Sequence, residues 1–259
     1  MYLTWLDSNS WLIEMGGKRV LLDPWLVGSL VFGNLPWLFK GDHPTPQPIP
    51  TDLDLILLSQ GLPDHAHVPT LERLDRNIPV VASATAAKIV NELGYQQVTT
   101  LVHGNSFTLS DSLKIQALPG SLVGPNLVEN GYLLTDLTNN STLYYEPHGS
   151  HTAALKDIAP VDVVITPLTD LEIPLLGSVI KGMKSAVKAV EWLQPQVIVP
   201  TAAGGNVVFE GLLLSILRGN GDVNQFRTML AEQNLTTRVL EPKPGDRFEV
   251  ELLSRVGVN

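Results

Sequence analysis

Short apolar runs, each about the length of one strand and bounded by glycine or proline, most constrain what this chain can fold into. The 259 residues include 21 Gly and 19 Pro, which interrupt helices and strands. The apolar runs at 53–58 and 161–165 suit buried strands and are far too short to cross a bilayer. Elsewhere apolar residues recur at helical spacing. The alternation predicts an α/β protein without membrane insertion.

The order of these runs predicts a strand meander first and alternating strands and helices later. Strands are expected at 2–6, 11–15 and 19–23, with Gly16-Gly17 in a hairpin turn. The strand at 53–58 precedes a helix with Val68, Leu71 and Leu74 on one face. Further strands are expected at 79–82, 113–118, 131–137, 142–145, 161–166, 197–200, 237–241 and 247–252, and helices at 84–93, 178–193, 208–217 and 223–233.

Residues 24–50 are too rich in proline for a helix or a central strand, and predict a long surface loop. Four aromatic residues, expected to be exposed, lie in it: Trp25, Phe32, Trp37 and Phe39. Such a loop can form the wall of a substrate pocket or a contact with a partner, including a homo-oligomer through residues 25–39. A packed Ω-type loop is an equally good interpretation.

Composition excludes several classes of protein. The formal charge of -9 disfavours binding to nucleic acid or anionic lipid, because like charges repel. The absence of cysteine excludes disulfides and thiolate metal sites. The first residues lack the basic and apolar regions of a secretory signal, so a cytoplasmic protein is expected. Neither a repeat nor a linker divides the chain, which predicts a single domain over 1–259.

Two clusters of histidine and carboxylate follow predicted strands. Asp64, His65 and His67 come after the strand at 53–58, and Glu146 and His148 come after the strand at 142–145. Loops at the carboxyl ends of strands are where α/β proteins place ligands. If these loops meet, the five side chains predict a site for one divalent ion (zinc, manganese, iron or nickel). Of the remaining histidines, His43 and His103 are expected in solvent, and His151 is expected to cap or support His148.

Residues 59–65 resemble the metallo-β-lactamase-fold signature Ser-His-x-His-x-Asp-His, which lies between a strand and a helix. Asp64 and His65 match the Asp-His pair, while Gln60 and Leu62 replace the first two histidines. Residues 21–26, which include Asp23-Pro24, resemble the ascorbate-phosphate-lactonase-like branch of that superfamily. This resemblance implies a four-layer αββα sandwich, with a mostly antiparallel first sheet and a mixed second sheet.

Other positions depart from the family pattern. Pro147 stands where the family has its bridging Asp, and Thr201 follows the strand at 197–200 without the family's histidine. The remaining donors are too few for two metals. The strings Ser-Gln-Gly-Leu and Tyr-Glu-Pro-His are similar to a divergent subgroup from photosynthetic organisms.

Two functions are consistent with these residues. In the first, the protein is a metal-dependent hydrolase of a small ester, lactone or phosphoester, with Asp64 as a ligand or as the general base toward a water. Gln60, Asp23 and Thr201 are then the expected substrate-side residues. In the second, the chain is a non-catalytic module that binds a small molecule or a protein, no ion is held, and Asp64 caps the following helix. Metal content separates the two.

Overall fold

Two seven-stranded sheets form the centre of the structure, a computed structural model that describes residues 1–254 except 46, 125 and 176. The strand order of the first sheet is β20 (Arg247–Glu249), β1 (Tyr2–Trp5), β2 (Trp11–Met15), β3 (Lys18–Leu22), β6 (Leu55–Leu58), β7 (Val80–Ala82) and β8 (Val98–Thr100). In this sheet β1, β2 and β3 form the predicted meander, and β6, β7 and β8 are added parallel to β3.

The second sheet has the same division into parallel and antiparallel halves. Its strand order is β19 (Arg238–Val239), β16 (Val197–Pro200), β13 (Val163–Thr166), β12 (Thr142–Tyr145), β11 (Leu127–Asp136), β10 (Leu113–Val123) and β9 (Ser106–Leu109). The strands β19, β16, β13 and β12 are parallel, and β11, β10 and β9 are added in antiparallel pairs.

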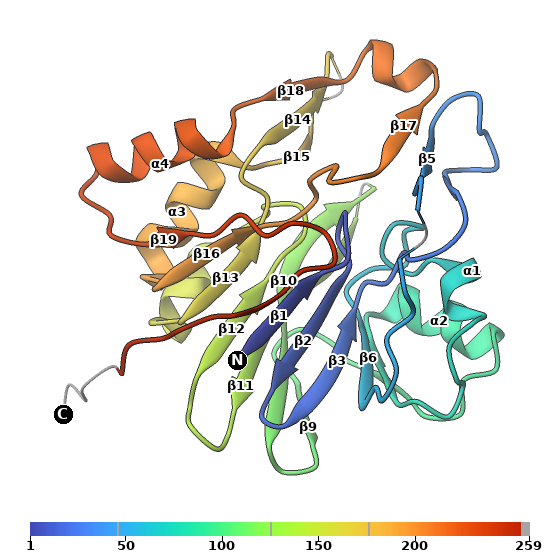
Figure 1. Cartoon of the computed structure of the whole chain (residues 1–259), viewed down its shortest axis with the longest axis horizontal. Helices are drawn as coiled ribbons and strands as arrows, with labels where there is room; N and C mark the ends of the chain where they lie inside the picture. Colours follow the sequence, from blue (N-terminus) through green and yellow to red (C-terminus); the bar gives the residue numbers. More distant parts are fainter. Residues whose placement is uncertain (46, 125, 176, 255–259) are drawn as a thin grey trace.

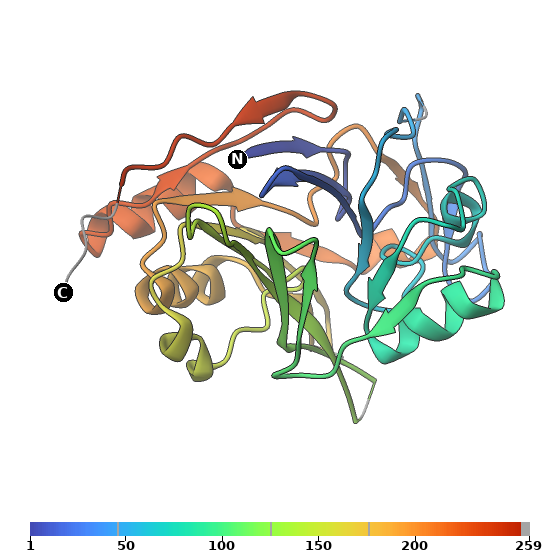
Figure 2. The same ribbon diagram turned by 90° about the horizontal axis from the view of Figure 1, so that it is seen from below.

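Helices cover the outer face of each sheet, so the order of layers is helix, sheet, sheet, helix (Figures 1 and 2). The first sheet is covered by α1 (Val68–Leu71) and α2 (Ala84–Glu92), and Ser83 caps α2 by accepting a hydrogen bond from the Ala86 N–H. The second sheet is covered by the 3₁₀ helix η1 (Ala153–Ile158), α3 (Met183–Leu193) and α4 (Val223–Glu232). The predicted four-layer αββα sandwich is therefore confirmed.

Strand alternation explains why the sheets stack in this way. Val20 and Leu22 of β3 point between the two sheets, while Leu21 points toward the α2 side. The same alternation along the other strands builds one apolar cluster between the sheets and one beneath each helical layer. In the described residues no helix is long and apolar enough to cross a membrane.

The structure corrects three predictions about local structure. The first sheet is not mostly antiparallel, because the β3–β6–β7–β8 half is parallel. The predicted helix at 178–193 begins only at Met183, after a strand. The predicted helix at 208–217 is a strand and a 3₁₀ turn around Gly211, whose φ of 117° does not occur within a helix. These segments belong to two small sheets. The strand order of one is β15 (Gly177–Ile180), β14 (Asp170–Ile173) and β18 (Arg218–Asn220). The strand order of the other is β17 (Val208–Glu210), β5 (Lys40–Asp42) and β4 (Leu30–Val31), and the 3₁₀ turn η2 (Leu212–Ser215) follows β17.

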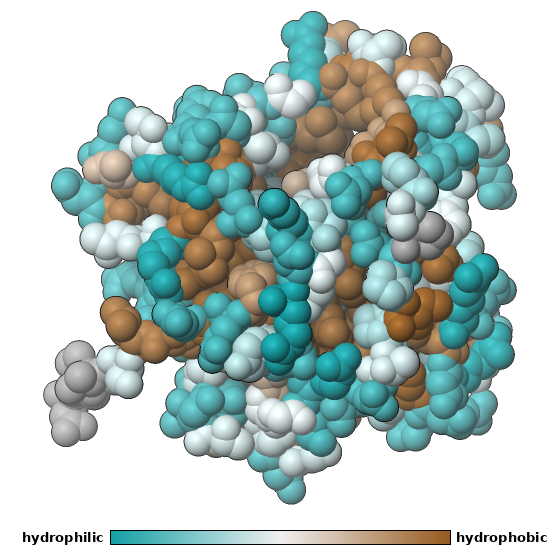
Figure 3. Space-filling view, viewed as in Figure 1, coloured by the Kyte–Doolittle hydropathy of each residue, from teal (hydrophilic) through white to brown (hydrophobic). Residues whose placement is uncertain are grey.

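The predicted loop at 24–50 is only partly a surface loop. It contains β4 and β5, and Trp25 is fully buried instead of exposed, with its indole N–H donating to the Gly28 carbonyl. Trp37 is 63% exposed, and its carbonyl accepts a hydrogen bond from the Leu212 N–H. Apolar side chains gather at this end of the molecule, over η2 and β17 (Figure 3). A homo-oligomer contact through residues 25–39 stays a prediction.

Candidate metal centre

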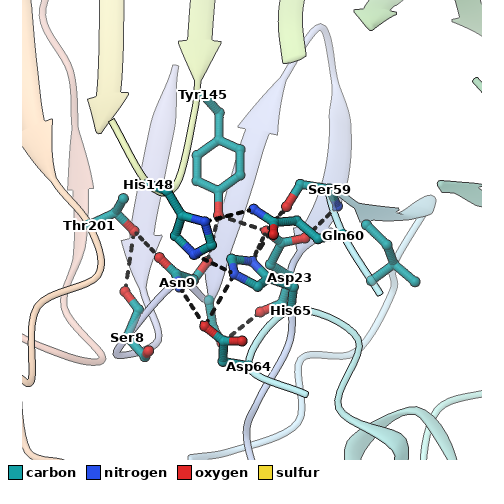
Figure 4. A network of polar contacts seen from close by, with 12 residues as sticks. Ser8, Asn9, Asp23, Ser59, Gln60, Asp64, His65, Tyr145, His148 and Thr201 are labelled. Atoms are coloured by element: carbon teal, nitrogen blue, oxygen red, sulfur yellow. Dashed lines mark hydrogen bonds and ion pairs between the residues drawn. The ribbon is translucent and has the colours of Figure 1, made fainter. Parts of the chain in front are cut away.

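The candidate site lies where strands of both sheets end at the same edge of the sandwich (Figure 4). The first sheet contributes Asp23 directly after β3 and the segment 59–65 directly after β6. The second sheet contributes His148, three residues past β12, and Thr201 directly after β16. Parallel strands carry their carboxyl ends to one edge, which is why residues far apart in the sequence meet here.

Asp23 is the buried centre of the hydrogen bonds that hold the first-sheet half of the site. Its carboxylate accepts from the Ser59 N–H at 2.7 Å and from the Ser59 hydroxyl. It also accepts from the Tyr145 hydroxyl at 2.7 Å, and its Oδ2 lies 2.7 Å from His65 Nδ1. Asp23 itself has a left-handed φ of 43°, the conformation that turns the chain out of β3. The Asp23 carboxylate thus fixes the rotamer of His65 and links the turn after β3 to the segment after β6 and to β12.

Three of the predicted ligands converge: Asp64, His65 and His148. One ligand atom from each lies within 4.8 Å of the others. His65 Nε2 is 3.3 Å from His148 Nε2 and 3.2 Å from Asp64 Oδ2. The two imidazole rings meet edge to face, with centroids 5.1 Å apart. Two nitrogens and a carboxylate oxygen therefore face a common point.

Burial and neighbouring charges shift the pKa values of all three residues in this cluster. Burial works against the charged form of His65, but the charges of Asp64 and Asp23 outweigh it and raise the pKa of His65 to about 10. Burial also opposes the charge of Asp64, yet the neighbouring His65 lowers the Asp64 pKa to about 2. Burial, reinforced by the charge of His65, lowers the pKa of His148 to about 4. At neutral pH the cluster contains an ion pair beside a neutral imidazole.

Unpaired oxygens show that the cluster suits a cation. Asp64 Oδ1 and Gln60 Oε1 are buried and have no hydrogen-bond partner in the part of the chain that the structure describes. A buried oxygen without a partner is costly unless something positive fills its place. Asp64, His65 and His148 form a nitrogen and oxygen donor set that first-row divalent ions accept. His65 also has the carboxylate support on its other nitrogen that metal-binding histidines usually have.

Two predicted ligands lie outside this cluster, so the expected five-residue set is reduced to three. His67 precedes α1, and its ring nitrogens contact the Thr70 hydroxyl at 3.1 Å and the Ser29 carbonyl at 3.2 Å. Glu146 turns back on its own loop, where its carboxylate accepts from the Ser150 N–H at 2.6 Å and the His148 N–H at 3.2 Å. Glu146 therefore shapes the loop that presents His148.

The three expected substrate-side residues are all buried at the site. Asp23 supports His65, as described above, and Gln60 Nε2 lies 3.4 Å from His148 Nδ1. The Thr201 hydroxyl accepts from the Trp11 indole and lies 3.3 Å from Asn9 Oδ1. Asp64 does not cap α1, because the cap position belongs to His67.

Sequence reasoning missed Asn9. Its side-chain amide reaches Asp64 Oδ2 at 3.4 Å, while its backbone carbonyl faces the Tyr145 hydroxyl. The available signal was the polar run at 7–10 between two apolar strands, all of which is buried in the structure. Of the three other histidines, His103 is exposed as expected, whereas His43 is half-buried against Trp25. The ring of His151 contacts the Tyr144 and Thr166 hydroxyls.

The αββα fold with a histidine and aspartate cluster at its edge defines a protein of the metallo-β-lactamase class. Structural similarity agrees with this assignment. The isothiocyanate hydrolase from Delia radicum gut bacteria superposes with a TM-score of 0.72 at 17% identity, over 98% of this chain and 100% of that one. Igni18, a metallo hydrolase from Ignicoccus hospitalis, gives 0.67 at 18% identity, over 96% and 99%.

Sequence similarity then gives the family. The family sequence model of the beta-lactamase superfamily domain matches residues 2–202, and the chain belongs to that superfamily. A UPF0173 metal-dependent hydrolase of Thermodesulfovibrio yellowstonii is 27% identical, over 96% of this chain and 92% of its own length. Another from Methanopyrus kandleri is 24% identical, over 96% and 100%. Both relatives are named metal-dependent hydrolases, and the similarity to each covers 96% of this chain.

Proposed function

We propose that this protein is a hydrolase that uses one divalent ion held by Asp64, His65 and His148. The observation that carries the proposal is the convergence of three ligand atoms within 4.8 Å beside buried, unpaired oxygens of Asp64 and Gln60. When bound, a divalent ion would polarise the substrate and make a water more acidic. The names of the full-length relatives support the same activity.

The chain's own residues have distinct tasks in this proposal. Asp23 holds His65 through Nδ1, which leaves Nε2 directed at the common point. Glu146 and its loop hold His148 from the opposite sheet. Asp64 has one oxygen toward His65 and the other without a partner, so it can be a ligand or can accept a proton from an attacking water. The Asn9 amide orients this carboxylate.

The substrate is proposed to be a small ester, lactone or phosphoester. The resemblance of residues 21–26 to the ascorbate-phosphate-lactonase-like branch favours a lactone or a phosphorylated compound. A single ion with three protein ligands leaves coordination positions for water and for one substrate oxygen, which suffices for attack on a carbonyl or phosphoryl group. No basic stretch is available for a nucleic-acid substrate in this acidic chain.

One observation favours the alternative, a binding module without a metal. A protonated His65 forms ion pairs with both Asp23 and Asp64, and so offsets one of their two negative charges without an ion. An ion must displace the proton from His65 Nε2 before it can bind there, so metal affinity should increase with pH. A module that has lost its metal would keep the proton at every pH below about 10.

Metal binding by the full chain tests the proposal. Protein purified without chelators should contain about one divalent ion per chain, and His148→Ala should lose at least about tenfold in affinity for Zn²⁺ or Mn²⁺, because one of three ligands is gone. Elemental analysis and titration calorimetry measure both quantities.

His103→Ala is the matched control, since it removes an exposed histidine that only contacts the Glu129 carbonyl. It should bind metal like the parent chain. Metal content near zero, with no binding at pH 8, would support the binding module and reject the hydrolase.

A further inference from the structure

A second cavity opens on the outer face of the second sheet, between α3, α4 and the segment 149–152. Its volume is about 640 Å³, the size of many small-molecule sites. Neither Asp64, His65 nor His148 lines it. The cavity is therefore separate from the candidate metal centre.

Three lysines give this cavity its character: Lys181, Lys184 and Lys188 all line it. Their spacing of three and four residues puts them along one side of α3 and its N-terminal approach. Within the described residues none of the three is within ion-pair distance of a carboxylate. The one acidic side chain of the lining, Asp170, accepts a hydrogen bond from the Gly182 N–H at 2.7 Å.

Three lysines border one concave space in a chain whose formal charge is -9, with 26 acidic and 17 basic residues. Solvated lysines on an amphipathic helix need no pocket around them. These lysines instead border a concave space whose walls focus their field onto whatever enters it. An anion is the ligand that such a field attracts.

The rest of the lining adds hydrogen-bond donors and an apolar wall. Asn220 and Gln225 offer side-chain amides, and Ser150 offers a hydroxyl. Trp192 and Met229 offer apolar surface on which an aromatic or aliphatic part can pack. This combination is suited to a small organic molecule with phosphate or carboxylate groups.

We propose that this cavity is a second ligand site, which binds a small phosphorylated or polycarboxylated molecule through Lys181, Lys184 and Lys188. The site adjoins the loop that carries His148. The Lys181 N–H donates to the His148 carbonyl at 2.8 Å, and the Ser185 hydroxyl donates to the Gly149 carbonyl. A ligand held against the start of α3 therefore lies next to backbone that positions a residue of the metal centre.

Calorimetric titration of the full chain with inorganic pyrophosphate, at constant ionic strength, tests this site. The parent chain should bind one pyrophosphate saturably. The double variant Lys184→Gln/Lys188→Gln should bind it at least about tenfold more weakly, because two of the three charges are removed from exposed helix positions that folding does not require.

The matched control is Lys88→Gln/Lys243→Gln, which removes the same charge from exposed lysines outside the cavity. It should stay within about twofold of the parent. Removal of an ion from elsewhere in the protein by pyrophosphate would affect both double variants equally. Absence of saturable binding by the parent, or equal weakening in both variants, would overturn the proposal.

Discussion

At the scale of single residues, the site depends on buried carboxylates whose partners are fully specified. The carboxylate of Asp23 is buried and has four hydrogen-bonding contacts, three from the segment 59–65 and one from Tyr145 of β12. Asp64 has two contacts to one oxygen and none to the other. This difference separates a supporting carboxylate from one that is available for chemistry, although both are aspartates beside the same histidine.

Asp23→Asn is the substitution that tests the supporting role. The amide keeps the shape of the side chain but removes one of the two anionic partners of His65. The free energy of unfolding should therefore fall by about 3 kcal/mol, and metal binding should weaken by about 10- to 100-fold. Urea denaturation and calorimetry measure these effects. Asp54→Asn, at a half-exposed pair with Lys18, should lose no more than about 1 kcal/mol. Equal losses in the two variants would contradict the role of Asp23.

His151 gives a pH dependence whose sign can be stated. Burial lowers the pKa of His151 to about 4, and its ring nitrogens contact the Tyr144 and Thr166 hydroxyls, each at 3.2 Å. The unfolded chain takes up a proton on this histidine at an ordinary pKa of about 6.5, whereas the native chain does so only near 4. Acidification from pH 6.5 toward pH 4 therefore favours unfolding.

The matched variant for this effect is His151→Gln, which offers hydrogen bonds but no titratable group. Between pH 7.5 and pH 4.5 the parent chain should lose about 2 kcal/mol more stability than the variant. Urea denaturation at the two pH values measures the difference. Parallel pH profiles for the two proteins would show that His151 is not the group responsible.

At the scale of elements, short loops after strands position the ligands, and their backbone is tightly packed. Gly149 follows His148 with a φ of 73°, and a Cβ at this position would lie 1.5 Å from the Lys181 carbonyl oxygen. The loop after β12 is thus pressed against the residues that begin α3. No side chain larger than hydrogen fits there without moving His148.

Gly149→Ala should therefore destabilise the fold by about 3 kcal/mol or more, because a backbone overlap adds to the left-handed backbone penalty. It should also weaken metal binding, since His148 is displaced. The control is Gly17→Ala, at a φ of 67° with no atom near the added Cβ, which should lose only about 1 kcal/mol. Thermal denaturation compares the two variants, and similar stabilities would refute the importance of this contact.

At the scale of the whole molecule, the two sheets are joined at the site edge by polar contacts as well as by the apolar core. The hydroxyl of Tyr132 in β11 donates to the Leu58 carbonyl at the end of β6 at 2.8 Å. Tyr145 in β12 reaches Asp23 after β3 in the same way. These contacts fix how far apart the sheets lie where the ligands of the metal centre meet.

Tyr132→Phe should destabilise the protein by about 2 kcal/mol, because the buried Leu58 carbonyl loses its side-chain donor. Chemical denaturation measures the change. Tyr2→Phe removes a hydroxyl that contacts Glu249 at an exposed sheet edge, and should stay within about 0.5 kcal/mol of the parent. A Tyr132→Phe protein as stable as the parent would mean that the apolar core alone holds the sheets together.

The sequence by itself determined most strand positions, and its family resemblance implied the αββα architecture. It proposed five ligands, of which the structure brings three together. Strands at 11–15, 142–145 and 197–200 follow from apolar runs bounded by turn residues, which depend on local patterns. The prediction of a helix at 208–217 was wrong because residues 208–210 pair with β5, which is remote in the sequence. This pairing outweighs the helical spacing of the apolar residues.

Only the tertiary structure decided which polar side chains share the site. Asp64, His65 and His67 have the same local signals, yet the chain direction after residue 65 turns His67 toward Ser29 and away from His148. Glu146 precedes His148 by two residues, but its carboxylate accepts from the Ser121 hydroxyl of β10 and from the Ser150 N–H of its own loop. Asn9 enters the site because the turn between β1 and β2 contacts Asp64 after β6 and Tyr145 of β12. The direction of a side chain depends on contacts between remote segments, and a linear pattern does not contain them.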